Sequence, residues 1–431
     1  MERFVIEGGQ RLAGRIKPAG NKNAALPLLA AALLTSERLV LQNMPNIGDV
    51  TIKLKLLEQL GVQVEKLDSH TWALQATTIL PVDPDTALCR KIRTSTLLAG
   101  PLLARRGCLK LPRPGGDMIG RRRLDTHFIA LQALGASVEV TPTSYILRTN
   151  GLRGADLFLD EMSVTGTEQA VLAAVLAEGH TTIGNAASEP HVQDLCYCLQ
   201  AMGARIQGIG TNLLEIEGVA RLGGATYTIG PDFMEVGSLI GLAAVTGSAI
   251  RIEGARPRDH RMTAIAFGKL GVSWQVEGQD LLIPGDQELA VRTDLHGAIP
   301  KIDSAPWPGF SPDLISTALV VATQAKGTIL IHEKMFESRL FFVDRLIGMG
   351  ARIVLCDPHR AVVVGPAQLY GEPEGLPSPD IRAGMALLLA ALCAKGRSVI
   401  YNIGQIDRGY ERIDERLRAL GANIERQGDP K

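Results

Sequence analysis

Hydrophobic and polar positions follow one arrangement six times along the chain. A helical stripe of apolar residues ends in a glycine, and a short stretch of alternating apolar and polar residues follows. Glycine can adopt the left-handed conformation that ends a helix, and alternation with a period of two is typical of a half-buried strand. The pattern therefore predicts six helix-to-strand junctions, at Gly61, Gly135, Gly203, Gly271, Gly350 and Gly421.

An earlier half of the same unit is visible in several copies as a helix of small apolar residues, a turn and a strand. Examples are residues 168–186, 315–333 and 384–402. Each unit thus reads strand-helix-strand-helix-strand-strand, which predicts an α/β fold. Successive glycines are 68 to 79 residues apart, so six units fill the 431 residues.

Six units divided three and three suggest two similar lobes. We expect the first lobe to span residues 22–230 and the second to combine residues 1–21 with 231–431. Ligand sites favour interfaces between domains, which predicts a site in a cleft between the lobes.

Composition narrows the class of protein. Lys and Arg number 45, as do Asp and Glu, so the formal net charge is zero and there is no basic excess for nucleic acid. The start, MERFVIEGGQ, lacks the layout of a signal peptide, and the longest apolar runs are about a dozen residues, shorter than a bilayer requires. The six cysteines have no zinc spacing, and we expect them to be buried thiols. We expect a soluble cytoplasmic protein without membrane insertion.

The basic residues are distributed unevenly, because several lie in loops just before an apolar helix. A helix N-terminus favours anions, and arginine adds bidentate recognition of phosphate or carboxylate. The sequence therefore predicts a site for a multiply charged anion. It contains no Walker loop, no dinucleotide fingerprint, no G-x-S-x-G elbow and no clustered histidines, so we expect neither metal nor organic cofactor. The basic residues in question are Lys22, Arg93, Arg122, Arg123, Arg339, Arg382 and Arg408.

Three segments carry a resemblance to a known family: GNKNAALPLLAAALL (20–34), PGGDMIGRRRLDTH (114–127) and IDRGYERIDERLRALGANIE (406–425). Through them the chain resembles the UDP-N-acetylglucosamine 1-carboxyvinyltransferases from Phe4 to about Arg426. More distantly it is similar to the 3-phosphoshikimate 1-carboxyvinyltransferases. The resemblance implies a two-lobed inside-out α/β barrel of six βαβαββ repeats. It also implies transfer of the enolpyruvyl group of phosphoenolpyruvate to the 3′-hydroxyl of UDP-N-acetylglucosamine, with release of phosphate.

The resemblance also implies roles for individual residues. Asp313 matches the base beside the sugar hydroxyl, and Asp117 stands where the family has its acid. Lys22, Arg122 and Arg408 match residues that bind phosphoenolpyruvate. Further residues match the nucleotide-sugar site or the cations around it: Asn23, Arg93, Arg123, Leu124, Asp125, Thr126, His127, Ser163, Val164, Met335, Arg339 and Arg382.

Four positions depart from the family pattern. Asp117 replaces a cysteine on a loop that we expect to act as a lid, which predicts resistance to the epoxide fosfomycin. Glu161 replaces a lysine near the diphosphate, and Arg123 replaces a proline, with Thr126 in place of leucine. Arg123 is expected to restore the cation that position 161 lacks.

The altered residues leave two alternatives open. One is a paralogous transferase that acts on another nucleotide or nucleotide sugar. The other is a catalytically idle homologue that binds a nucleotide sugar. The sequence does not give the oligomeric state.

Overall fold

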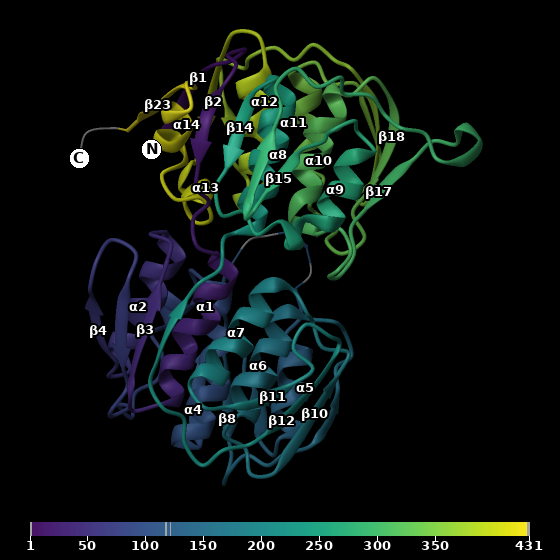
Figure 1. Ribbon diagram of the computed structural model, residues 1–431. Coiled ribbons are helices and arrows are strands. Elements are labelled where there is room, and N and C mark those ends of the chain that lie inside the picture. Colours follow the sequence, from purple (N-terminus) through teal and green to yellow (C-terminus); the bar gives the residue numbers. More distant parts are fainter. Residues whose placement is uncertain (1, 117–118, 121, 429–431) are drawn as a thin grey trace. The chain divides into compact units, whose positions relative to one another are not determined.

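The structure, a computed structural model, describes residues 2–116, 119–120 and 122–428. The chain divides into two compact units (Figure 1). We call Gly20–Asp117 with Arg122–Gly230 the 20–230 unit, and Met1–Ala19, Met118–Arg121 and Pro231–Lys431 the 231–431 unit.

The 20–230 unit contains three sheets around a helical centre (Figure 1). The first has the order β13 (Ala225–Thr228), β3 (Arg38–Gln42), β5 (Trp72–Gln75), β4 (Gln63–Lys66). The second is β6 (Cys108–Pro112), β8 (Ser144–Arg148), β7 (Ser137–Val140). The third is β11 (Arg205–Gln207), β12 (Leu213–Glu217), β10 (His180–Gly184), β9 (Asp156–Phe158). Its α-helices are α1 (Lys22–Ala31), α2 (Gly48–Gln59), α3 (Thr86–Cys89), α4 (Ala99–Arg106), α5 (Asp125–Ala133), α6 (Val164–Ala174) and α7 (Pro190–Ala201).

The 231–431 unit is built in the same way. One sheet is β21 (Leu376–Pro377), β22 (Arg397–Tyr401), β1 (Arg3–Glu7), β23 (Asn423–Gln427). The next is β15 (Gln275–Glu277), β16 (Asp280–Ile283), β14 (Ala249–Ile252), β2 (Ala13–Ile16). The last is β17 (Lys301–Asp303), β18 (Gly327–His332), β20 (Arg360–Gly365), β19 (Ile353–Asp357). Its α-helices are α8 (Phe233–Thr246), α9 (Arg261–Gly268), α10 (Pro312–Gln324), α11 (Val343–Gly348), α12 (Ile381–Cys393), α13 (Gly404–Asp407) and α14 (Ile413–Ala419).

Each sheet corresponds to one repeat of the sequence. Two repeats are continuous in the chain: β9-α6-β10-α7-β11-β12 and β17-α10-β18-α11-β19-β20. Three others borrow a strand from a distant segment, because β13 pairs in parallel with β3, β2 pairs in parallel with β14, and β1 lies between β22 and β23. These observations confirm the α/β assignment.

One repeat differs from the predicted order. The sheet β6-β8-β7 has three strands, and the described residues before α4 form the short helix α3 and a 3-10 helix, Arg93–Leu98, where the pattern predicted a first strand. This 3-10 helix carries Arg93, so the exception coincides with a candidate binding residue.

The six predicted junctions are confirmed. Each of the repeat glycines has a positive φ, between 85° and 104°, a conformation that a side chain makes costly. Each follows one of the helices α2, α5, α7, α9, α11 and α14 and precedes a strand.

The core of each unit consists of helices buried on nearly all sides. In the 231–431 unit α8, α10 and α12 pack against one another, and glycines allow close approach: a Cβ on Gly241 would lie 2.5 Å from Cγ2 of Thr317. Although these helices are strongly apolar, none in the described part of the chain combines the length and hydrophobicity that a bilayer crossing requires. The expectation of buried cysteines is wrong for Cys108 and Cys356, which are exposed.

Candidate active site

The candidate site in the 20–230 unit begins at the N-terminus of α1. The side chain of Asn21 caps this helix by accepting hydrogen bonds from the backbone N–H groups of Asn23 (2.8 Å) and Ala24 (3.2 Å). Lys22 is the first residue of the helix, is 7% exposed, and forms a 2.8 Å ion pair with Asp49 at the start of α2. The capped helix end and Asp49 therefore fix the position of the predicted phosphoenolpyruvate lysine.

Arg93 opens the 3-10 helix Arg93–Leu98, which leads directly into α4. Its Nη2 donates to the backbone oxygen of Arg123 (2.7 Å), and its buried Nε has no hydrogen-bond partner among the described residues. Burial and then the positive charge of Arg122 lower the pKa of Arg93 to about 10. The guanidinium remains protonated at neutral pH, and a buried donor without a partner suits an anionic ligand.

Residues 122–127 form the start of α5 and the loop before it. Arg123 is exposed and lies 3.0 Å from the carboxylate of Asp125 and 3.7 Å from that of Asp160. Thr126 donates to Asp160 (2.6 Å), and Leu124 is buried. The structure thus joins these residues to the 160–164 segment.

His127 is buried, and its Nε2 lies 2.8 Å from Oγ1 of Thr165. Burial, followed by the charges of Arg93 and Arg122, lowers the pKa of His127 to about 3. The imidazole is therefore neutral at physiological pH. The positive charges of Arg93 and Arg122 add to the effect of burial, because they disfavour a further positive charge on the ring.

Ser163 and Val164 stand at the N-terminus of α6. The Ser163 hydroxyl accepts a hydrogen bond from the backbone N–H of Gly166 (3.2 Å) and caps the helix, whose first residue is Val164. A helix N-terminus favours anions, whereas the exposed carboxylate of Glu161, two residues earlier, opposes them.

In the 231–431 unit, Asp313 lies between two arginines. Its Oδ1 accepts from Nη2 of Arg339 (2.8 Å) and its Oδ2 from Nε of Arg382 (2.9 Å). Asp313 is in the first turn of α10, whose N-cap is the Ser311 side chain. Arg339 and Arg382 are 3% and 6% exposed, so these charge-assisted hydrogen bonds form in a largely dehydrated environment.

Tyr410 supports this cluster from the segment before α14. Its hydroxyl accepts from Nη1 of Arg382 (3.2 Å) and lies 2.9 Å from the hydroxyl of Ser238. Burial by itself would lower the pKa of Arg382, but Asp313 and then Tyr410 raise it above its ordinary value. Arg408, at the end of α13, donates to the side chain of Gln405 (2.9 Å).

Met335 is held through its backbone. The buried carboxylate of Glu333 accepts from the N–H groups of Met335 (2.8 Å) and Phe336 (3.2 Å) and from the hydroxyl of Ser304 (2.9 Å). The Phe336 ring in turn lies 5.3 Å from the guanidinium carbon of Arg339.

The structure therefore brings the predicted residues together in two sets, one in each unit, and Asp117 lies outside the described residues. The sequence reading did not single out Asp49, Asp160 or Glu333 as parts of the site. Asp49 had a detectable signal, because an acidic residue in the first turn of a helix is favoured by the positive end of the helix dipole. Glu333 and Asp160 had none beyond following a strand.

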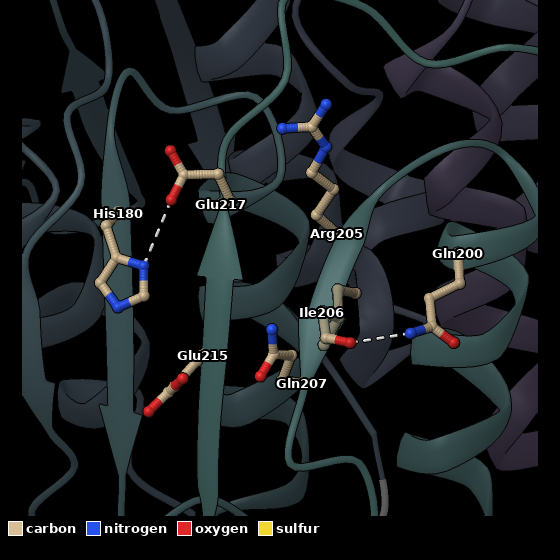
Figure 2. A pocket seen from close by; sticks show the side chains of 7 residues that line it. All are labelled: His180, Gln200, Arg205, Ile206, Gln207, Glu215 and Glu217. Atoms are coloured by element: carbon tan, nitrogen blue, oxygen red, sulfur yellow. Dashed lines mark hydrogen bonds and ion pairs between the residues drawn. The ribbon is translucent and has the colours of Figure 1, made fainter.

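The 20–230 unit also has a pocket of about 460 Å³ on the sheet that contains β10, β11 and β12 (Figure 2). None of the site residues predicted from the sequence lines it. Its charges have both signs, and one pair, His180 and Glu217, is 3.4 Å apart. We do not assign the reaction to this pocket. The lining residues are His180, Gln200, Arg205, Ile206, Gln207, Glu215 and Glu217.

Comparison with known proteins supports the family that the sequence resembles. The sequence model of the family EPSP synthase (3-phosphoshikimate 1-carboxyvinyltransferase) matches residues 6–417. Curated relatives named UDP-N-acetylglucosamine 1-carboxyvinyltransferase include those of Treponema denticola, 56% identical, and Treponema pallidum, 55% identical. In each, the alignment covers at least 99% of both chains.

Solved structures show the same fold at low sequence identity. The enolpyruvyl transferase NikO from Streptomyces tendae superposes with a TM-score of 0.87 at 23% identity and covers 100% of this chain and 99% of its own. EPSP synthase from Acinetobacter baumannii superposes with a TM-score of 0.76 at 17% identity and covers 99% of this chain and 100% of its own. The chain belongs to the EPSP synthase family and, within it, to the UDP-N-acetylglucosamine 1-carboxyvinyltransferases.

Proposed function

We propose that this chain transfers the enolpyruvyl group of phosphoenolpyruvate to the 3′-hydroxyl of UDP-N-acetylglucosamine and releases phosphate. This is the first committed step of peptidoglycan synthesis, and it takes place in the cytoplasm. The observation that carries the proposal is the 56% identity, over 99% of the chain, to relatives that bear this enzyme's name. We assign Lys22, Asp313 and Arg408 to these substrates on the resemblance of the segments that contain them.

The residues divide by substrate. Lys22, Arg122 and Arg408 bind the phosphate and carboxylate of phosphoenolpyruvate and stabilise its charge during addition and elimination. The nucleotide sugar is bound by a larger set: Asn23, Arg93, Arg123, Leu124, Asp125, Thr126, His127, Ser163, Val164 and Met335. Arg339 and Arg382 orient Asp313 and supply further positive charge.

Asp313 acts as the base that takes the proton of the sugar hydroxyl. Two charge-assisted hydrogen bonds fix the direction of its carboxylate, which a general base requires.

Asp117 acts as the acid that protonates the methylene carbon of phosphoenolpyruvate. An ordinary aspartic acid has a pKa near 3.9, so desolvation or an adjacent phosphate must raise the pKa of Asp117 before it can donate a proton near neutrality. Because a carboxylate lacks the nucleophilic sulfur of cysteine, fosfomycin should leave the enzyme active, whereas it should inactivate Asp117→Cys. An adduct at position 117 of the unaltered chain would contradict this assignment.

Arg123 is our candidate for the positive charge that is lost where Glu161 replaces a lysine. Asp125 raises the pKa of Arg123 by its hydrogen bond and charge, while Asp160 and Glu161 add smaller contributions. Three carboxylates therefore share one exposed guanidinium. We expect Arg123→Ala to weaken UDP-N-acetylglucosamine binding measured by calorimetry, and an unchanged affinity would remove the compensation.

Phosphate release separates this function from its alternatives. Purified enzyme with phosphoenolpyruvate and UDP-N-acetylglucosamine should release phosphate, whereas other nucleotides should give little. Release only with another nucleotide would identify the paralogous transferase, and no release with any acceptor would favour the idle homologue. Metal chelators should have no effect, since the proposal requires no cofactor.

The architecture proposed for this reaction is the two-lobed inside-out α/β barrel, with three repeats in each lobe. Support comes from the buried helices and flanking sheets within each unit. The lobes correspond to residues 22–230 and to 1–21 with 231–431.

A further inference from the structure

A fully buried lysine on α2 has no role in the reaction described above. Lys53 is 0% exposed, and its Nζ donates to the backbone oxygen of Thr94 (2.7 Å). It occupies one position of the apolar stripe that also contains Val50, Leu54 and Leu57. Burying an amine in such a stripe costs free energy that a leucine would not, so the residue requires an explanation.

The surroundings of Lys53 contain two other titratable groups. Burial lowers the pKa of Lys53 to about 7, while Cys89 and Glu168 act in the opposite direction. Glu168, on α6, is fully buried, and its own pKa is raised by burial and then by Glu189. Both the ammonium and the neutral amine can donate to the Thr94 carbonyl, so this hydrogen bond persists through the titration.

Thr94 belongs to the 3-10 helix Arg93–Leu98. Hydrogen bonds within a 3-10 helix have poor geometry, so such a segment relies on contacts from outside. Two side chains from other helices supply these contacts. Lys53 donates to the Thr94 carbonyl. The side-chain amide of Gln169, in the orientation in which both its nitrogen and its oxygen find partners, donates to the Thr96 carbonyl (2.9 Å). The position of this segment therefore depends on donors from α2 and α6.

Arg93 is the residue that this anchoring affects most directly. It precedes Thr94, and its guanidinium contacts the backbone oxygen of Arg123 (2.7 Å). One turn before Lys53 on the same helix, Asp49 holds Lys22 (2.8 Å). One face of α2 thus contacts both Lys22 and the carbonyl of Thr94, the residue after Arg93.

We propose that Lys53 is a positioning residue for nucleotide-sugar binding, which fixes the Thr94 carbonyl and thereby aims Arg93 at the ligand. The inference rests on the proposed function, because it takes Arg93 as a ligand of UDP-N-acetylglucosamine. Lys53 touches no substrate itself. It acts through the carbonyl of Thr94, the residue that follows Arg93.

The test compares Lys53→Met with Lys55→Met, which makes the same change at an exposed position two residues later on α2. Losing one buried hydrogen bond to a charged or polar donor typically costs enough to change affinity about tenfold. We expect Lys53→Met to raise both the calorimetric Kd and the KM for UDP-N-acetylglucosamine about tenfold. The kcat and the KM for phosphoenolpyruvate should change less than about threefold.

A second variant separates positioning from stability. Lys53→Gln keeps an N–H donor without the charge and should recover part of the lost affinity, whereas a purely structural role would change the unfolding midpoint and leave the Kd of the folded protein unaltered. An unchanged Kd in folded Lys53→Met, an equal rise in Lys55→Met, or failure of both Lys53 variants to fold would overturn the inference. Absence of phosphate release by the unaltered enzyme would instead overturn the proposed function.

Discussion

The two units use the same strand and helix repeat but arrange their charges differently. In the 231–431 unit a carboxylate is at the centre, and both oxygens of Asp313 accept from buried arginines. In the 20–230 unit Arg93 donates to a backbone carbonyl, and Arg122 lies close enough to lower the pKa values of both Arg93 and His127. One unit therefore holds a carboxylate oriented by two arginines, whereas the other concentrates positive charge.

This difference lies at the starts of helices and in the segments beside them, and not in the order of strands and helices in the repeat. Both units present helix N-termini capped by a side chain, as at α1, α6 and α10. The two units differ in the charged residues that follow each capped helix start and in the partners of those residues. Function therefore depends on these few positions, while the repeat supplies a common scaffold.

The largest expected effect comes from breaking the centre of the 231–431 set. Asp313→Asn keeps the size of the side chain but removes the charge that both arginines contact and the group that accepts the proton. We expect kcat to fall by roughly 10²–10⁴-fold, as for loss of a general base. The rate of phosphate release measures this change. Asp344→Asn, at an exposed position of α11, makes the same substitution as a matched control. Full activity of Asp313→Asn would exclude the assignment of Asp313 as the base.

In the 20–230 set, removing the charge of Arg93 should weaken substrate binding. Arg93→Met removes a charge-assisted donor but no reacting group, so the KM for UDP-N-acetylglucosamine should rise by about 10- to 100-fold with a smaller change in kcat. Arg90→Met, exposed in the same segment, controls for loss of a charge. A selective fall in kcat would place Arg93 at the reacting atoms instead.

A buried histidine in each unit should make the free energy of unfolding depend on pH. Burial is the leading cause that lowers the pKa to about 3 for His127 and to about 4 for His260. Between these values and the ordinary value near 6.5, the unfolded chain binds more protons, so stability falls as the pH falls below about 6.5.

At pH 5 the loss at His127 amounts to about 2 kcal/mol relative to neutral pH. Denaturant unfolding at pH 7.5, 6 and 5 should show a smaller acid loss in His127→Gln than in the unaltered chain. His260→Gln should behave in the same way. Equal slopes in all three proteins would mean that neither histidine is neutral in the folded state.

The smallest effects concern the repeat glycines. A Cβ on Gly203 (φ 100°) meets nothing within 4 Å, so Gly203→Ala should cost only backbone strain, about 1–2 kcal/mol. A Cβ on Gly271 (φ 85°) would lie 2.7 Å from the backbone nitrogen of Ala290, so Gly271→Ala should cost more. Thermal unfolding should give a lower midpoint for Gly271→Ala than for Gly203→Ala. A lower midpoint for Gly203→Ala would contradict this argument from packing.

Much of the fold could be predicted because its signals are local. The six glycines, the alternating strands and the small-residue helices each depend on neighbours within a few positions. The exception was one repeat, whose sheet β6-β8-β7 has three strands and whose first helix is preceded by the 3-10 segment Arg93–Leu98. The conformation of this segment depends on donors from α2 and α6, which are 41 and more than 70 residues away in the chain.

The candidate site divides in the same way. Its basic residues and Asp313 could be selected from the sequence, since they stand in segments that resemble a family and lie near helix starts. Their partners could not, because the pairing of Asp313 with Arg382 spans 69 residues and that of Arg93 with Arg123 spans 30. Pairing across such distances is set by how the helices pack.

The sequence by itself determined the sixfold repeat, the α/β class and the residue types available for an anionic substrate, because helix ends and strand alternation are properties of short segments. The tertiary structure alone decided which charges meet. It placed Asp313 between two arginines, Asp49 beside Lys22, and Lys53 beneath the segment that carries Arg93. Electrostatic interactions depend on distance and burial, and only the packed chain fixes both.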